Sequence, residues 1–193
     1  KYLDAFGFGA KTNIDIMGEG AGVVPDQAWK EKTIGTKWVL GDTYNVSIGQ
    51  GNLLVTPLQL ARAYAALANG GKLMQPLLVK KVVDNDKKII FESSTLVVAA
   101  GAGNEKNLSV VRVGMRQTVT DGSARRLADL PVAVAGKTGT AQAPRGATHA
   151  WFSSFAPFDD PQIALVILFE EGGEGSAVAV PAAHEIYQWY FGG

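Results

Sequence analysis

The pattern of apolar and polar positions predicts a helix in the first half of the chain. Residues 56–59 read Thr-Pro-Leu-Gln, so that a capping threonine is followed by a proline at the first helical position and a glutamine three residues after the cap. Apolar residues then recur at helical spacing until Gly70 and Gly71 end the helix. These residues are Leu58, Ala61, Tyr64, Ala65 and Ala68.

Two further helices are predicted in the second half of the chain. One follows Asn107 and ends at Asp121 and Gly122, and its apolar residues fall on one face. That face comprises Leu108, Val111, Met115 and Val119. The other helix covers residues 182–190, whose apolar positions also keep helical spacing.

Strand-like runs fall into two groups. Residues 76–83 and 88–91 flank the polar turn 84–87, which predicts a hairpin. Residues 151–156 and 163–169 predict two strands joined by a short turn.

A further buried strand is predicted at residues 132–135, leading directly into Gly136-Lys137-Thr138-Gly139-Thr140. Three successive strands with short links imply antiparallel pairing. With the glycine-rich segment 6–25 expected to form a connecting loop, the pattern predicts an α+β fold in which helices pack on an antiparallel sheet.

Composition narrows the class of protein. The 193 residues suit a single domain, and 18 basic against 18 acidic side chains argue against a nucleic-acid partner. The chain has no cysteine and only two histidines far apart, so we expect no disulfide, no metal site and no cofactor. The longest apolar run, residues 163–169, is far shorter than the roughly 18 to 20 residues that cross a bilayer, so we expect no membrane anchor in this chain.

The segment Gly136-Lys137-Thr138 could belong to a phosphate-binding loop, and two features disfavour that interpretation. A phosphate-binding loop needs a glycine five positions before Gly136, where this chain has Pro131. The intervening residues 132–135 are strand-like rather than glycine-rich. Taken alone, Lys137 could also be a solvated lysine at the end of a strand.

The surroundings of this segment favour another interpretation. Lys137-Thr138-Gly139 continues as Thr140-Ala141-Gln142, and His149-Ala150-Trp151-Phe152 opens the next strand. Upstream, residues 44–51 read Tyr-Asn-Val-Ser-Ile-Gly-Gln-Gly and run into the predicted helix at 56–61. Over nearly its whole length the chain resembles class B penicillin-binding proteins, and within that class it is most similar to the penicillin-binding protein 2 type. The resemblance implies a penicillin-binding/serine β-lactamase-like transpeptidase fold that is incomplete here, with residues 1–193 as the C-terminal portion of a single transpeptidase domain.

The resemblance also implies roles for the Lys-Thr-Gly segment. The expected substrate is a peptidoglycan stem peptide ending in D-Ala-D-Ala, for which β-lactam antibiotics substitute. Lys137 is expected to place positive charge beside the substrate carboxylate and the proton-transfer network, and Thr138 and Thr140 to bind that carboxylate through their hydroxyls. Gly139 is expected to let the substrate backbone approach the strand, and the Thr140 N–H to be one of two oxyanion donors.

Other residues near this segment receive no firm role from the sequence. Gln142 and Arg145 could contact peptide substrate or belong to a loop, and His149 and Trp151 could line the rim of a cleft. His184, in the final helix, is expected to be structural.

The chain departs from the family in lacking a nucleophile. The family needs Ser-x-x-Lys, and no serine of this chain has a lysine three residues later; a Ser-x-Asn motif is also missing. The serines are Ser47, Ser93, Ser94, Ser109, Ser123, Ser153, Ser154 and Ser176. We therefore expect a fragment that is inactive alone, and we expect it to need the N-terminal part of the domain or a swapped copy as a partner.

The parent protein is expected at the periplasmic face of the bacterial inner membrane, with its anchor upstream of this soluble chain. Two alternatives stay open. One is a related D,D-carboxypeptidase or serine β-lactamase-like protein, and the other is a non-catalytic interaction module on the same fold.

Overall fold

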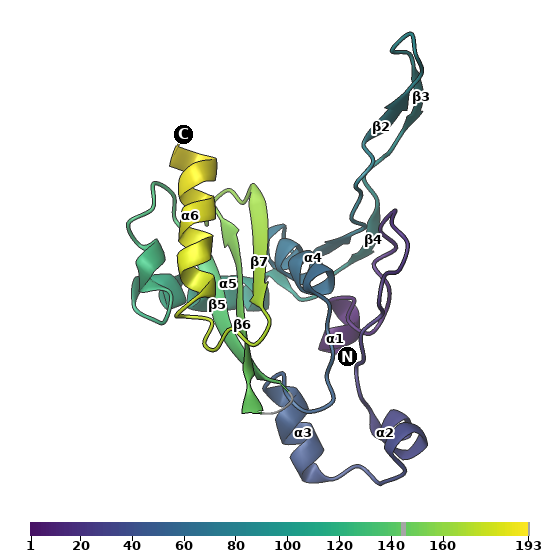
Figure 1. Ribbon diagram of the computed structural model, residues 1–193, viewed down its shortest axis with the longest axis vertical. Coiled ribbons are helices and arrows are strands. Elements are labelled where there is room, and N and C mark those ends of the chain that lie inside the picture. The colour runs from purple at the N-terminus through teal and green to yellow at the C-terminus, as the bar shows by residue number, and fades with distance from the viewer. Residues whose placement is uncertain (144–145, 193) are drawn as a thin grey trace.

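The computed structural model describes residues 1–143 and 146–192, which form an α+β fold around a three-stranded antiparallel sheet (Figure 1). The strands are β5 (Ala135–Gln142), β6 (Thr148–Ala156) and β7 (Ile163–Phe169), in the order β5-β6-β7. Every residue of β5 has a partner in β6, from Ala135 opposite Phe155 to Gln142 opposite Thr148. The predicted antiparallel pairing is therefore confirmed.

The position of the Lys-Thr-Gly segment in its strand differs from the prediction. Residues 132–134 are not in a strand, and β5 begins at Ala135, so the segment lies inside the strand rather than after it. Val134 is fully buried, and its carbonyl accepts a hydrogen bond from Arg116 at 2.9 Å instead of from β6. The apolar run at 132–134 is therefore core packing that precedes the ladder.

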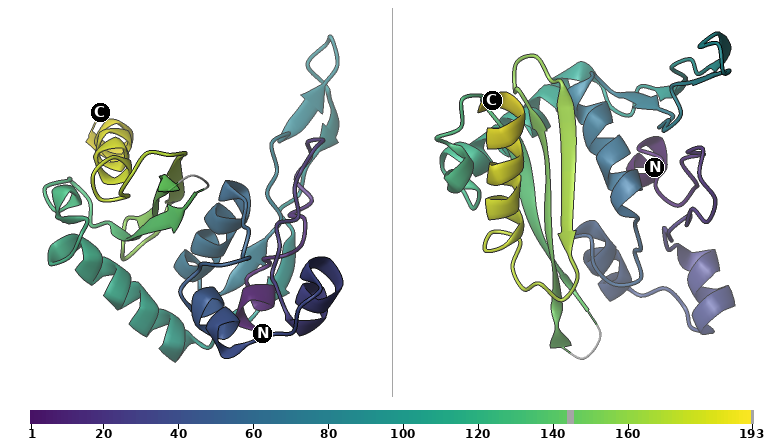
Figure 2. Two further views of the ribbon diagram at one scale, coloured as in Figure 1. Left: turned by 60° about the horizontal axis from the view of Figure 1, so that its bottom comes forward. Right: turned by 45° about the horizontal axis from the view of Figure 1, so that its top comes forward.

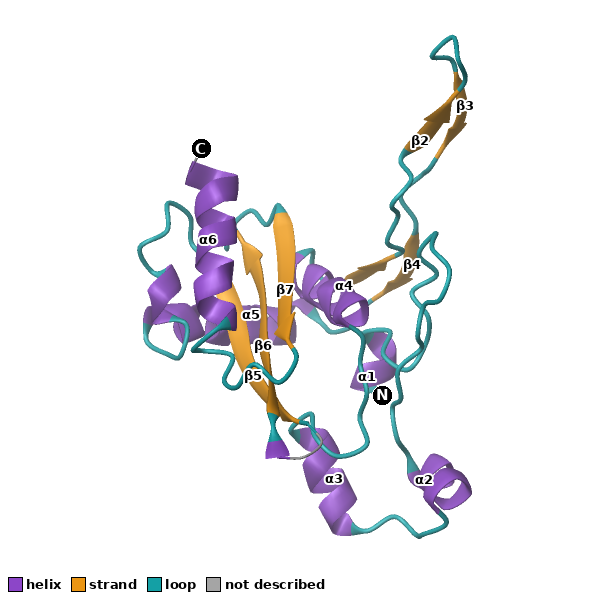
Figure 3. Cartoon of the chain, in the orientation of Figure 1, coloured by secondary structure: helices purple, strands orange, loops and turns teal. Residues whose placement is uncertain are grey.

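One face of the sheet is covered by the C-terminal helix α6 (Ala179–Gly192), together with the short 3₁₀ helix η1 (Arg125–Leu127) (Figure 3). Tyr187 of α6 is fully buried, and its hydroxyl bonds to the hydroxyl of Ser154 at 2.8 Å. The predicted C-terminal helix is confirmed and is longer than expected. The buried core cluster on this side of the sheet contains Val119, Ala124, Leu127, Leu130, Val134, Phe152, Ala156, Ala179, Val180, Ala183 and Tyr187.

The opposite face packs on α4 (Pro57–Ala68) and α5 (Glu105–Thr120) (Figures 1 and 2). The predicted capping box of α4 is present, because the Thr56 hydroxyl accepts from the Gln59 N–H at 3.1 Å and the Gln59 amide oxygen accepts from the Thr56 N–H at 3.0 Å. Met115, Phe155 and Ala135 form the buried centre of this second cluster.

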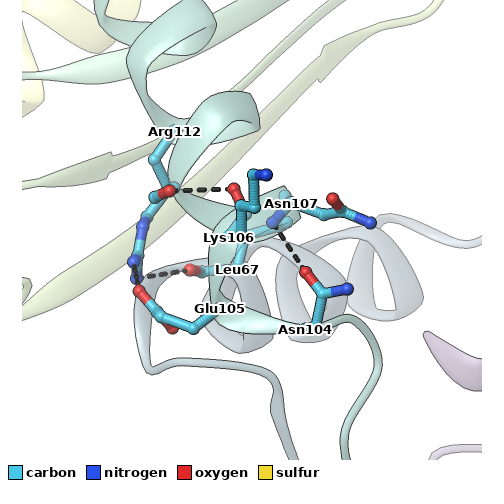
Figure 4. A network of polar contacts seen from close by, with 7 residues as sticks. Leu67, Asn104, Glu105, Lys106, Asn107 and Arg112 are labelled. Atoms are coloured by element: carbon cyan, nitrogen blue, oxygen red, sulfur yellow. Dashed lines mark hydrogen bonds and ion pairs between the residues drawn. The ribbon is translucent and has the colours of Figure 1, made fainter.

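Helix α5 begins earlier than predicted, because Asn104 caps it by accepting a hydrogen bond from the Asn107 N–H at 2.9 Å (Figure 4). Arg112 pairs with Glu105 and also donates to the Leu67 carbonyl at 3.4 Å, which joins α5 to the end of α4 (Figure 4). Leu108, Met115 and Val119 are buried as predicted, whereas Val111 is 46% exposed. The expected apolar face is therefore only partly covered.

A long two-stranded ribbon extends away from the sheet (Figures 1 and 2). At its base β1 (Lys72–Met74) pairs with β4 (Val97–Ala100), and further out β2 (Lys81–Val83) pairs with β3 (Ile89–Glu92). The outer pair confirms the predicted hairpin with shorter strands, and all of its residues are exposed.

The N-terminal segment is a loop, as predicted, after one short helix α1 (Tyr2–Ala5). Side chains of α4 hold this loop in place. Gln59 is fully buried and donates to the carbonyls of Ala10 and Ala21 at 2.8 Å, and the Arg62 guanidinium donates to the Gly7 carbonyl at 2.9 Å.

Two helices that the sequence pattern did not predict follow this loop: α2 (Gln27–Ile34), capped by Asp26, and α3 (Leu40–Ser47). They are joined by an ion pair of Lys30 and Asp42 at 2.6 Å. Neither helix has a buried residue, so their side chains carry no strong apolar period.

Candidate functional site

The Lys-Thr-Gly segment lies on an edge strand, because β5 is the outermost strand of the sheet in the described residues. Beyond the strand ends, the Ala143 N–H donates to the Ala147 carbonyl at 2.9 Å and continues the same register. In an antiparallel pair, bonded and non-bonded positions alternate, so the odd-numbered residues of β5 bond to β6. The N–H and C=O groups of Thr138 and Thr140 therefore point outward along the free edge.

Two side chains already contact this outward edge. The Lys137 ammonium donates to the Thr138 carbonyl at 2.7 Å, and the Gln50 amide donates to the Thr140 carbonyl at 3.1 Å. Both bonds fit the outward direction of the even-numbered carbonyls. The structure thus brings Gln50, from the segment 44–51, into contact with Thr140 directly after Lys-Thr-Gly, although the two residues are 90 positions apart in sequence.

Lys137 is exposed at the middle of the strand, opposite Ser153 of β6. No ion pair among the described residues involves Lys137. Burial raises the pKa of Tyr64 in α4 to about 12, so this phenol stays neutral near neutral pH. The Lys137 ammonium has three hydrogen-bond donors, one of which bonds to the Thr138 carbonyl.

Thr138 has a partner that the sequence did not reveal. Its hydroxyl lies 2.7 Å from the hydroxyl of Ser123, which follows the end of α5. In the sequence, Ser123 is one of eight serines, none of which has a lysine three residues later. No local sequence pattern predicts this contact, because it arises from the packing of the end of α5 near β5.

Glycines of the segment are needed by the packing around them. A Cβ built on Gly136 would lie 2.5 Å from the Phe152 ring, and one built on Gly139 would lie 3.2 Å from the Cβ of Trp151. Gly175 in turn lies against the same strands, since its Cβ would be 2.6 Å from the Gly139 carbonyl oxygen. Gly139 therefore allows close approach within the protein itself.

Two of the other residues that the sequence pointed to, His149 and His184, make contacts within the protein itself. The His149 Nδ1 accepts a hydrogen bond from the Glu171 N–H at 3.1 Å, and the His184 Nε2 lies 3.0 Å from the Asp129 carboxylate. Trp151 stands opposite Gly139 in the ladder, and Gln142 ends β5. Arg145 lies outside the described residues.

No cluster of three potential metal ligands is present among the residues that the structure describes. None of their helices has both the length and the apolar character needed to cross a bilayer.

Comparison with known proteins identifies the class. Residues 1–188 match the family described as the penicillin binding protein transpeptidase domain, and the chain belongs to this family. It is 33% identical to the peptidoglycan D,D-transpeptidase MrdA of Haemophilus influenzae, over 98% of this chain and 32% of that protein. The corresponding protein of Escherichia coli K12 is 30% identical over 92% of this chain and 31% of its own length.

The structural comparison agrees. The crystal structure of Pseudomonas aeruginosa PBP2 in complex with WCK 5153 has a TM-score of 0.82 at 35% identity, over 97% of this chain and 42% of that chain. These findings confirm the predicted family, its penicillin-binding protein 2 type and the fold class. The chain spans about a third of the length of the curated relatives it matches.

Proposed function

We propose that this chain is the C-terminal portion of a single peptidoglycan D,D-transpeptidase domain, in which β5 binds the substrate peptide. The observation that carries the proposal is the outer edge of β5, which pairs with no strand among the described residues and toward which the N–H and C=O groups of Thr138 and Thr140 point. An extended peptide can add to such an edge through main-chain hydrogen bonds. The matching relatives are named D,D-transpeptidases, which supports this assignment.

The reaction is acyl transfer through a serine that this chain does not contain. The serine oxygen bonds to the carbonyl carbon of the penultimate D-alanine, and the bond from that carbon to the terminal D-alanine nitrogen breaks. The departing amine takes the serine proton. The amine nitrogen of a second peptide then bonds to the ester carbonyl carbon, the bond from that carbon to the serine oxygen breaks, and the proton of the amine passes to the serine oxygen, which forms the cross-link and restores the serine.

In this reaction the residues of β5 have distinct tasks. The Thr140 N–H stabilises the negative charge that develops on the carbonyl oxygen, because it points outward from the sheet. Lys137 places positive charge beside the proton-transfer network and the terminal carboxylate. The hydroxyls of Thr138 and Thr140 bind that carboxylate, and Ser123 holds the Thr138 hydroxyl at 2.7 Å.

The nucleophile belongs to a part of the longer protein that precedes Lys1. Two observations support this: the chain lacks Ser-x-x-Lys, and it spans about a third of its relatives. On the outer face of α5, the apolar side chains of Val110 and Val113 are 67% and 50% exposed, which is typical of a surface that packs against another part of a domain. The preceding part of the domain, or a swapped copy of it, covers this face.

The substrates and location follow from the same assignment. The partners are a stem peptide ending in D-Ala-D-Ala and β-lactam antibiotics, and a related protein, penicillin-binding protein A of Mycobacterium tuberculosis, is known as a ceftriaxone acyl-enzyme complex. The working place of the longer protein is the periplasmic face of the bacterial inner membrane, where peptidoglycan is cross-linked.

Labelling with a fluorescent penicillin tests the proposal. The longer protein that carries this sequence should form a covalent adduct on a serine upstream of Lys1, located by peptide mass analysis, and this chain alone should form none. Lys137→Ala should reduce the acylation rate about 100-fold or more, since the variant removes a charge from the reaction centre. His184→Ala should leave the rate close to that of the wild type. An adduct on this chain, or equal effects of the two variants, would contradict the assignment.

A further inference from the structure

Ser123 lies in a tight turn whose backbone is held on both sides. Before it, a Cβ built on Gly122 would lie 2.9 Å from the Thr118 carbonyl oxygen, so the chain turns back closely against the end of α5. After it, Ala124 is fully buried, and its N–H donates to the Thr118 carbonyl at 3.0 Å. Ser123 itself is exposed. The turn therefore presents a serine side chain at the surface from a backbone that the core fixes.

Thr138, the partner of Ser123, is held from the side of the sheet. Its neighbours in β5 form the bonded pairs with β6, and Thr138 stands opposite Phe152. Residues directly opposite each other point to the same face of a sheet, and Phe152 belongs to the same buried cluster as Ala124. The Thr138 side chain therefore lies on the face that receives the turn after α5, and its hydroxyl is 2.7 Å from the Ser123 hydroxyl.

Each of these two hydroxyls has a single proton, which decides the direction of the bond between them. In the protein alone, either hydroxyl can be the donor. In the proposed function Thr138 gives its proton to the carboxylate of the substrate, because a carboxylate only accepts hydrogen bonds. The bond between the hydroxyls then persists only with Ser123 as its donor. Binding thus creates two bonds that run in one direction, from Ser123 to Thr138 and from Thr138 to the carboxylate, and each polarises and strengthens the other.

We propose that Ser123 is a positioning residue for the Thr138 hydroxyl, and that through this bond the protein selects substrates with a free terminal carboxylate. This inference rests on the proposed transpeptidase function. A carboxylate benefits most from an aligned donor, because a hydrogen bond to an ionised acceptor is about twice as strong as one to a neutral acceptor. An ester at the same position benefits less. Loss of the Ser123 hydroxyl therefore weakens recognition of the carboxylate and leaves the chemical step nearly unchanged.

The test compares a fluorescent penicillin with the methyl ester of its carboxylate, each reacted at several concentrations with the longer protein. This separates the initial dissociation constant from the acylation rate constant. Ser123→Ala should raise the dissociation constant of the free acid about three- to tenfold, the effect of one hydrogen bond, and that of the ester by less than about twofold. Ser123→Thr keeps a hydroxyl on an exposed side chain and should restore the wild-type preference for the acid. The acylation rate constant and the melting temperature should stay near the wild-type values in both variants.

A double variant shows whether Ser123 acts through Thr138. Thr138→Val removes the hydroxyl that Ser123 holds, so the addition of Ser123→Ala should cause no further loss of acid binding. Ser93→Ala is the matched control, because the Ser93 hydroxyl also donates a hydrogen bond, to the Val79 carbonyl, beside the outer ribbon that extends away from the sheet (Figure 1). It should bind the acid and the ester like the wild type.

An unchanged preference for the acid in Ser123→Ala would overturn the inference, as would an equal loss for the ester or a further loss in the double variant. A wild type that binds acid and ester equally would overturn it too. If one of these results appears while Lys137→Ala still reduces formation of the serine adduct, the transpeptidase assignment stands and this inference alone is wrong. If the wild type forms no adduct, both are wrong.

Discussion

Gly136 is a residue of strand β5 that also forms part of the packed core. It precedes Lys137, and the Phe152 ring fills the space where a side chain would be. At this position the packing of the core is sufficient to require glycine.

Gly136→Ala should therefore destabilise the protein through overpacking. A Cβ at 2.5 Å from the Phe152 ring forces that ring to move, at a cost of about 1–3 kcal/mol. Gly41→Ala in α3 is the control, because no atom lies within 4 Å of its added Cβ. Urea unfolding of both variants checks the prediction, and an equal free energy of unfolding in the two would contradict it.

Because the phenol of Tyr187 is buried, we expect the protein to lose stability at high pH. Burial raises the pKa of this phenol to about 12 from the ordinary 10.0, so the folded state favours the neutral phenol. This contribution is complete below pH 10 and is lost as the pH rises through 12. The expected decrease in the free energy of unfolding is about 1–3 kcal/mol, at about 1.4 kcal/mol per pKa unit.

Unfolding measured between pH 8 and 12 tests this, with Tyr187→Phe as the comparison. The variant should lose about 1 kcal/mol at pH 8, because its bond to Ser154 is missing. It should then show a weaker decline above pH 10. Parallel pH profiles for the two proteins would show that another group is responsible.

The sequence identified some site residues and could not identify others, for a physical reason. Lys137, Thr138, Gly139 and Thr140 form a contiguous motif, so they could be selected by pattern, although their roles stay predictions. Ser123 lies 15 positions from Thr138 and Gln50 lies 90 positions from Thr140. Contacts at such separations are created by tertiary packing and leave no trace in local spacing.

At the level of elements, local signals decided which ones could be predicted. Helix α4 carries a complete capping box, and strand β7 was predicted with its observed bounds, because both have strong patterns. Helices α2 and α3 were missed because neither buries a residue and so neither needs an apolar face. Strands β1 and β4 are three and four residues long, too short for a clear alternation.

The outer ribbon of β2 and β3 should be the first element to open. Its residues are all exposed, and its strands pair only with each other among the described residues. Brief trypsin digestion should therefore cut first at lysines 80, 81, 87 or 88, which lie in and beside the ribbon. Mass analysis of the first fragments checks this. Early cleavage at Lys137 instead would mean that the sheet is the weaker element.

At the scale of the whole molecule, the exposed side of α5 predicts a difference between this chain and the longer protein. Val113→Asp should change the melting temperature of this chain little, because the side chain is already 50% exposed. In the longer protein the same change should lower it clearly, since a charge would be buried at the interface.

Val82→Asp is a suitable control for that comparison, as Val82 lies on the ribbon and is 41% exposed. It should have a small effect in both proteins. Equal effects of Val113→Asp in the two proteins would argue that the preceding part of the domain does not cover α5.

The order of the sheet strands along the chain has a consequence for the order of folding. Strands β5, β6 and β7 follow one another in sequence and pair with their neighbours through short connections, so the sheet closes through contacts that are near in sequence. The N-terminal loop, by contrast, is fixed by Gln59 and Arg62 across about 40 to 55 positions. Because short loops close at a lower entropic cost, we expect residues 105–192 to form the folding nucleus and the loop to dock late. During synthesis, the segment made last would then organise the segments made before it.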